Sequence, residues 1–306
     1  EGKSIAYVDE KVLFVPNTVP GDIVDVQVTR KRKSFLEGFI VNVRKYSDIR
    51  TEPFCSHFGI CGGCKWQNLP YQLQTEFKQQ EIIDNLQRIG KVELQNVSPI
   101  IGSPKTTYYR NKLEYTFCNK RFLTREEIAN GQDIDRTPAV GFHVPGLFDK
   151  VIDIEKCYLQ AEPSNGVRNF IREYAIEHEL SFYDIREQAG FLRTLIIRTS
   201  STGEVMVIVT FGEENREARE GLLNAIVQQF PEITSLMYVI NEKMNDTITD
   251  QEVICFHGND HIFEQMEDLK FKIGPKSFYQ TNSEQAYNLY AKTRELAGLT
   301  GKETVY

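Results

Sequence analysis

Three cysteines within ten residues constrain this chain more than any other feature of its sequence. Cys55, Cys61 and Cys64 lie in the stretch 48–70, which is rich in glycine and proline and has no hydrophobic periodicity. Such a stretch predicts an irregular loop that is ordered by something other than an apolar core. Six cysteines in 306 residues are too few for a disulfide scaffold. Clustered cysteines in a chain without an export signal instead favour metal ligation.

The spacing of these cysteines suits a metal centre. In Cys61-Gly62-Gly63-Cys64, two intervening residues let the chain turn back so that two thiolates bind one metal, and glycine permits the turn. Three close cysteines and a distant fourth fit tetrahedral zinc or a cubane iron–sulfur cluster, and spacing does not choose between the two metals. The alternatives are an ordinary set of thiols and a redox-active Cys-x-x-Cys.

Three other cysteines compete for the fourth position. Cys118 and Cys255 lie in apolar, strand-like runs, where a thiol is usually a small core residue. Cys157 instead follows the polar end of a strand-like run, at 153–156. We therefore predict Cys157 as the fourth ligand.

The first 46 residues predict a small β-barrel such as the OB fold. Short apolar or alternating runs occupy 5–8, 12–15, 23–28 and 39–43, with turn residues between them. A basic run lies between the third and fourth of these strands, where such barrels project loops. It consists of Arg30, Lys31, Arg32 and Lys33. We predict that this run contacts RNA; a barrel used only for stability is the alternative.

The rest of the chain predicts a mixed arrangement of helices and strands. A helix over 71–89 with an apolar stripe ends at Gly90. Helices are expected at about 162–179 and 214–229, and at 283–297 with Ser283 as its N-cap. The runs 191–199 and 204–211 form a predicted hairpin, so the region is not a plain doubly wound sheet. Further strands are predicted at 112–118, 139–143, 235–240 and 269–273.

Charge and hydropathy exclude some classes of protein and leave others open. No apolar run approaches the roughly 20 residues that a membrane span needs, so we expect no membrane association. The formal net charge is −7, yet the stretch 101–125 has six basic residues and one acidic residue. Such asymmetry permits a local site for a polyanion, with a solvated surface as the alternative. The cysteine usage predicts a cytoplasmic location.

Several segments together resemble one family. Phe54 to Gln67 resembles the iron–sulfur loop of the RNA (uracil-5-)-methyltransferases, specifically the bacterial 23S ribosomal RNA type, and the N-terminal barrel resembles their RNA-binding TRAM domain. Three shorter matches follow in family order: Tyr109-Arg110-Asn111-Lys112, Asp153-Ile154-Glu155-Lys156-Cys157 and Phe278-Tyr279-Gln280-Thr281-Asn282. The implied fold class is α/β with an N-terminal β-barrel. Its expected domains are the TRAM barrel (1–47), a mixed α+β cluster domain (48–268) and the start of a Rossmann-like methyltransferase domain (269–306).

The resemblance also implies cofactors, a substrate and site residues. It implies a [4Fe-4S] cluster on Cys55, Cys61, Cys64 and Cys157, and S-adenosylmethionine as methyl donor with Gln280 among its ligands. Arg110 and Phe278 are expected near a flipped uridine in single-stranded or loop RNA, which in this branch is 23S rRNA. We predict Lys112 as a further RNA contact. The alternatives are surface ion pairs for Arg110 and Lys112, a backbone-satisfying amide for Gln280 and a core position for Phe278.

The catalytic residues of that family are expected outside these 306 residues. The chain begins with Glu1 rather than Met and stops where residues 301–306 predict a turn into a new strand. By resemblance, the Gly-rich cofactor loop, the catalytic Cys and the general base follow that strand. We therefore assign no catalytic residue and expect a monomeric fragment that does not methylate RNA alone. A non-catalytic RNA-binding module with a structural metal and a redox iron–sulfur protein are the competing hypotheses.

Overall fold

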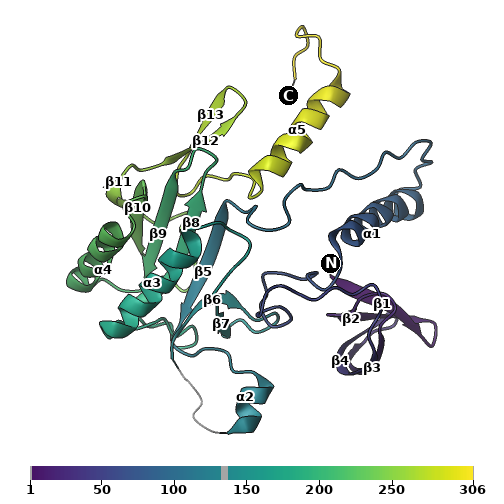
Figure 1. Cartoon of the computed structure of the whole chain (residues 1–306), viewed down its shortest axis with the longest axis horizontal. Coiled ribbons are helices and arrows are strands. Elements are labelled where there is room, and N and C mark those ends of the chain that lie inside the picture. Colours follow the sequence, from purple (N-terminus) through teal and green to yellow (C-terminus); the bar gives the residue numbers. More distant parts are fainter. Residues whose placement is uncertain (1, 132–136, 306) are drawn as a thin grey trace. The chain divides into compact units, whose positions relative to one another are not determined.

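The computed structural model describes residues 2–131 and 137–305, which divide into two compact units (Figure 1). Unit 1 is Glu1–Gly102 and unit 2 is Ser103–Tyr306. The three-part division into 1–47, 48–268 and 269–306 stays a prediction. Within the described ranges, every helix is too short or too polar to cross a bilayer.

Unit 1 begins with a four-stranded sheet whose order is β1-β2-β4-β3. Its strands confirm the four N-terminal predictions with slightly wider bounds, and they are β1 (Lys3–Val8), β2 (Lys11–Pro16), β3 (Ile23–Lys31) and β4 (Phe35–Lys45). Strands β2 and β4 pair in parallel, and the other neighbours are antiparallel. Leu13, Val15 and Leu36 form the small core of this sheet. Closure of the sheet into a barrel stays a prediction.

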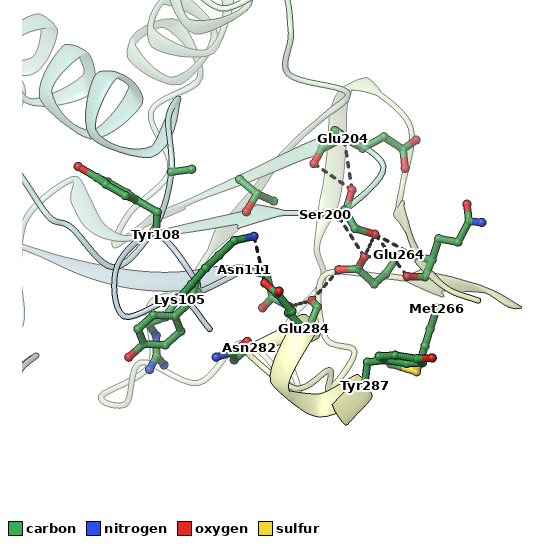
Figure 2. A pocket seen from close by; sticks show the side chains of 18 of the residues that line it. Lys105, Tyr108, Asn111, Ser200, Glu204, Glu264, Met266, Asn282, Glu284 and Tyr287 are labelled. Carbon is green, nitrogen blue, oxygen red and sulfur yellow. Dashed lines mark hydrogen bonds and ion pairs between the residues drawn. The ribbon is translucent and has the colours of Figure 1, made fainter. Parts of the chain in front are cut away.

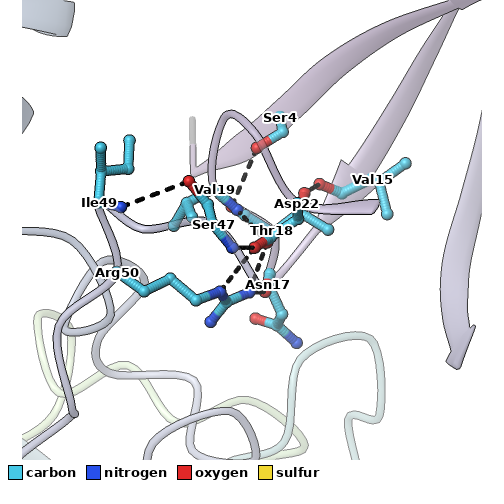
Figure 3. A network of polar contacts seen from close by, with 9 residues as sticks. All are labelled: Ser4, Val15, Asn17, Thr18, Val19, Asp22, Ser47, Ile49 and Arg50. Atoms are coloured by element: carbon cyan, nitrogen blue, oxygen red, sulfur yellow. Dashed lines mark hydrogen bonds and ion pairs between the residues drawn. The ribbon is translucent and has the colours of Figure 1, made fainter. Parts of the chain in front are cut away.

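A partly buried ion pair ties the sheet of unit 1 to the segment that leads into the cysteine loop (Figure 3). Arg50 donates two hydrogen bonds to the Asp22 carboxylate, with N···O distances of 2.8 and 2.6 Å. The backbone N–H groups of Val19 and Ser47 donate to the same carboxylate. Burial raises the pKa of Asp22, but these hydrogen bonds outweigh it, so the pKa lies below its ordinary value.

The predicted helix at 71–89 is confirmed, but its apolar stripe is not a buried face. The segment forms α1 (Tyr71–Asp84), continues as a π-helical turn (Asn85–Ile89) and is followed by Gly90. Within the described residues of this helix none is buried, and Phe77 and Ile82 are exposed. The stripe predicted the period of the helix correctly. It did not predict burial, because burial also requires an element that covers the stripe.

Unit 2 is organised around a seven-stranded sheet of order β11-β10-β9-β8-β5-β6-β7. Its strands are β5 (Lys112–Cys118), β6 (Ala139–His143), β7 (Val151–Asp153), β8 (Leu192–Thr199), β9 (Val205–Phe211), β10 (Ser235–Ile240) and β11 (Ile254–Gly258). Strands β8 and β9 form the predicted hairpin, in which Ile196 faces Ile208. Only β9 and β10 pair in parallel in the described part of the sheet. The prediction that this region is not a plain doubly wound sheet is therefore confirmed.

Both faces of this sheet are covered. Helices α3 (Ser164–Glu177) and α4 (Arg216–Gln229) lie on one face (Figure 1). The alternate residues Ile196 and Ile208 point to the other face, where they pack with Ile262 and Ile273. Those two residues belong to the hairpin of β12 (Ile262–Met266) and β13 (Leu269–Ile273). The sequence predicted β13 but not β12, β11 or the short helix α2 (Arg125–Asn130).

The chain leaves the hairpin through an irregular segment and enters α5 (Ser283–Ala297). Asn282, rather than the predicted Ser283, caps this helix, because its side chain accepts a hydrogen bond from the Gln285 N–H at 3.0 Å. Gly298 ends it in the left-handed conformation, with φ 58°. Residues 302–305 form no strand, contrary to the prediction, and Tyr306 lies outside the described residues.

Candidate functional site

Asn111 joins two sequence motifs that lie about 170 residues apart. Its side-chain amide donates to the Gln280 carbonyl and to the Ser283 hydroxyl, both at 2.8 Å. Its backbone N–H donates to the Thr281 carbonyl at 2.8 Å. The motif at 109–112, just before β5, is therefore bound directly to the motif at 278–282, just before α5.

The backbone of the irregular segment before α5 is anchored while two of its side chains face outward. Phe278 is 84% exposed and Gln280 is exposed, whereas Tyr279 between them is half-buried and packs against Phe271 with ring centroids 5.9 Å apart. The alternation is that of an extended chain with one face on the core. Phe278 is thus a surface residue, and the alternative of a core position is wrong.

Glu264 on β12 is a buried carboxylate at the base of this region. It is 2% exposed and accepts hydrogen bonds from the Ser201 N–H at 3.0 Å and from the Ser283 hydroxyl at 2.9 Å. The Ser201 hydroxyl also donates to it. Because buried carboxylates need such donors, these contacts fix the β8–β9 turn, β12 and the start of α5 to one another.

These elements surround a pocket of about 710 Å³ (Figure 2). Its wall includes Lys105, Tyr108, Arg110, Asn111, Glu264 and Tyr287. An ion pair between Lys105 and Glu284, with an N···O distance of 3.0 Å, links two sides of the pocket. The volume lies within the range of about 300–1,000 Å³ that is usual for ligand sites. Cations, carboxylates and tyrosine rings together suit a polar, ring-containing ligand.

Arg110 is half-buried in the wall of this pocket. Its backbone N–H donates to the Leu159 carbonyl at 2.8 Å, and the Tyr108 N–H donates to the Tyr158 carbonyl at 2.7 Å. The motif at 109–112 therefore runs beside the residues that follow Cys157. The Arg110 Nε atom is buried and has no hydrogen-bond partner among the described residues.

The other predicted RNA contacts have different surroundings. Lys112 forms an ion pair with Glu114, with an N···O distance of 2.5 Å, which is the alternative that we considered for it. Arg30, Lys31, Arg32 and Lys33 are all exposed. Contrary to the prediction of a loop, Arg30 and Lys31 belong to the end of β3, where they pair with β4, and only Arg32 and Lys33 lie between the two strands. The Arg30 guanidinium lies 3.3 Å from a Glu37 carboxylate oxygen, so part of its charge is neutralised.

Cys55, Cys61 and Cys64 share one irregular loop of unit 1, and all three are half-buried. Hydrogen bonds between backbone groups shape the loop: the Phe58 N–H donates to the Cys55 carbonyl, and the Ile60 and Cys61 N–H groups donate to the His57 carbonyl. The Gly63 N–H donates to the Cys61 sulfur at 3.4 Å, as expected for a thiolate ligand. The donor chemistry thus fits a metal centre. The described side chains nevertheless form no group of three His, Cys, Asp or Glu residues that could hold a metal ion.

The three remaining cysteines belong to unit 2 and differ in exposure. Cys157 is buried, and Asn165 holds its backbone from both sides: the Cys157 N–H donates to Oδ1 at 2.7 Å, and Nδ2 donates to the Cys157 carbonyl at 3.1 Å. Cys118 is a buried core residue, as predicted, and burial raises the pKa of its thiol. The same prediction for Cys255 is wrong. Cys255 is exposed because β11 is an edge strand that is only partly covered.

Three residues of the site were not predicted as functional. Asn111 belongs to the motif at 109–112 but was given no role of its own. Glu264 lies in β12, a strand that was not predicted. Arg198 carries a charge inside β8, a buried strand whose other charged residue is Arg193, and a charge in a buried strand was the one available indication of a special role. Its guanidinium donates to the carbonyls of Ser277 at 2.7 Å and Pro275 at 3.4 Å.

Comparisons with known proteins place the fold and the site in a class. The family model of the TRAM domain matches residues 1–41. The chain is 58% identical over 309 residues to an RNA methyltransferase of Bacteroides thetaiotaomicron, covering all of this chain and 68% of that protein. It is 54% identical over 312 residues to an RNA methyltransferase of Porphyromonas gingivalis, covering all of this chain and 67% of that protein. Both relatives are described as uncharacterized.

A solved structure extends the likeness. The Pyrococcus abyssi tRNA (uracil-54, C5)-methyltransferase, in complex with S-adenosyl-L-homocysteine, matches with a TM-score of 0.66 and 27% identity. The match covers 93% of this chain and 60% of that one. The chain belongs to the RNA methyltransferase family.

Proposed function

We propose that this chain is part of an enzyme that transfers a methyl group from S-adenosylmethionine to carbon 5 of uracil in RNA. The observation that carries the proposal is the likeness of 93% of the chain to the Pyrococcus abyssi tRNA (uracil-54, C5)-methyltransferase. In this proposal the 306 residues bind the RNA and contribute to the binding of the methyl donor. The substrate that we propose is a single-stranded or loop uridine of 23S rRNA, and the compartment is the cytoplasm.

The chemistry assigns separate tasks to the residues of the site. A base that is modified at carbon 5 must leave its stack, and an exposed aromatic ring can stabilise an unstacked base. Phe278 supplies such a ring. Arg110 can contact phosphate or stack on a base, and the Gln280 amide can both donate to and accept from a polar edge of the cofactor. S-adenosylmethionine, when bound, supplies an electrophilic methyl group.

The product in the cell tests this function. The gene that encodes the chain is deleted in its natural host, and nucleosides of purified 23S rRNA and tRNA are analysed by mass spectrometry. We expect 5-methyluridine to disappear from 23S rRNA and to return on complementation. Loss of 5-methyluridine from tRNA alone would make tRNA, and not 23S rRNA, the substrate. Unchanged 5-methyluridine in both RNAs would contradict the proposed function.

We further propose a [4Fe-4S] cluster on Cys55, Cys61 and Cys64 of unit 1, with Cys157 as the fourth ligand. The support is the shared loop of three thiols and the N–H donor to the Cys61 sulfur. Iron and acid-labile sulfide are measured on anaerobically purified protein, and about four of each per chain are expected. Stoichiometric zinc without sulfide would reject the cluster but would leave the methyltransferase proposal intact.

A further inference from the structure

Arg198 is a buried cation with no evident electrostatic reason to be buried. It is 6% exposed on β8, and its printed hydrogen bonds within the described residues go to backbone carbonyls and not to a carboxylate. Its Nε atom is buried without a hydrogen-bond partner in the same described part of the chain. Burial lowers the pKa of the guanidinium, and the Glu114 carboxylate offsets only part of this effect. Burying a charge without a counter-charge costs free energy, so the position of Arg198 calls for an explanation in what its hydrogen bonds hold.

A second buried arginine on the same strand shows what a structural role looks like. Arg193 is 1% exposed and forms an ion pair with Asp246 at 2.9 Å. It also donates to the carbonyls of Asn241 at 2.7 Å and Lys243 at 2.5 Å. Arg193 therefore has a counter-charge, and it holds a loop that contains none of the candidate site residues.

The contacts of Arg198 lead to the backbone next to Phe278. Both carbonyls that it binds, those of Pro275 and Ser277, lie within three residues before Phe278. Asn111 binds the Gln280 carbonyl on the other side of Phe278. The backbone is thus held on both sides of a phenyl ring that is 84% exposed. Because the backbone is already fixed, only the side-chain rotations of Phe278 lose freedom when a base stacks on its ring.

We propose that Arg198 is a positioning residue for RNA binding, which holds the backbone at 275–277 so that the Phe278 ring can stack on an unpaired base. The inference rests on the proposed function, because it takes single-stranded RNA as the partner of Phe278. Arg198 itself touches no RNA in this arrangement and acts only through Phe278.

The test is a double-mutant cycle on the full chain with a matched control. The probe is a fluorescein-labelled, uridine-containing single-stranded RNA, and its dissociation constant is measured by fluorescence anisotropy. Phe278→Ala should weaken binding about tenfold, the usual loss when a stacking ring is removed. Arg198→Met should weaken binding by about threefold to tenfold, and the double variant should bind no more weakly than Phe278→Ala. Arg193→Met should lower the unfolding temperature and leave the dissociation constant unchanged.

The other outcomes separate the positioning role of Arg198 from the RNA-binding role of the chain. Wild-type affinity of Arg198→Met, additive losses in the double variant, or an equal loss of binding in Arg193→Met would overturn the positioning role alone. If Arg198→Met does not fold, Arg198→Lys replaces it, with the same requirement of non-additivity with Phe278→Ala. Wild-type protein that does not bind the probe would overturn both the inference and the proposed RNA-binding role.

Discussion

The two compact units of this chain are stabilised by different interactions. In unit 2, strands β8 and β9 bury nearly every residue between two covering layers. In unit 1, the buried apolar side chains are few among those described, and the long helix α1 buries none. Unit 1 relies instead on the polar contacts around Asp22 and, in our proposal, on the cysteine loop. The comparison shows that one chain can combine an apolar core with a unit that depends on specific polar or metal contacts.

The largest expected effect tests the metal dependence of unit 1. Cys64→Ser should abolish iron and sulfide binding and lower the free energy of unfolding of unit 1 by several kcal/mol, because metal binding is coupled to folding. Fluorescence of Trp66, the only tryptophan, reports on this unit. The matched control is Cys255→Ser, an exposed cysteine of unit 2, which should change neither quantity. If Cys64→Ser were as stable as wild type, unit 1 would not depend on a metal for its stability.

The next effect tests the apolar core of unit 2. Ile208 is fully buried in β9, so Ile208→Ala should lower the free energy of unfolding by about 2–5 kcal/mol through lost burial and a residual cavity. Urea unfolding followed by circular dichroism measures the change. Leu296→Ala, at an exposed position of α5, should stay within about 0.5 kcal/mol of wild type. Trp66 fluorescence reports the unfolding of unit 1. If Ile208→Ala shifted that transition as much as the one measured by circular dichroism, the division into two compact units would be contradicted.

A smaller effect is expected from the ion pair of unit 1. Arg50→Met leaves the Asp22 carboxylate, whose side chain is 1% exposed, without its cation and should cost about 2 kcal/mol. The control is Arg44→Met, which breaks an ion pair with Asp25 whose side chains are 65% and 44% exposed. Such an exposed pair contributes at most about 1 kcal/mol. Both variants are compared by urea unfolding with Trp66 fluorescence, and similar losses in the two would mean that burial of Asp22 has no special role.

The smallest effect is a dependence on pH. The folded pKa of Asp22 lies below its value in the unfolded chain, so its contribution is complete above the unfolded pKa. The contribution is lost as the pH falls from about 4 through the folded pKa. Unfolding midpoints of wild type and Arg50→Met should therefore converge on acidification. A constant difference between the two would show that the pair does not depend on the charge of Asp22.

The sequence predicted the elements of unit 2 more fully than its site. Runs such as 204–211 are apolar and β-branched enough to predict buried strands, and the β8–β9 hairpin follows from the turn residues between them. It could not predict the contacts of Asn111, because a hydrogen bond to a residue about 170 positions away leaves no local pattern. The edge position of Cys255 was missed for the same reason, since strand order is a non-local property.

By itself, the sequence determined the period of most helices and strands, the clustered thiols and the motifs that resemble RNA (uracil-5-)-methyltransferases. These depend on residues close together along the chain. Only the tertiary structure decided that Phe278 is exposed, that Arg198 is buried beneath its backbone and that Asn111 and Glu264 meet at Ser283. The physical reason is that burial and hydrogen-bond partners are set by which distant segments pack together, and that choice depends on the free energy of the whole fold.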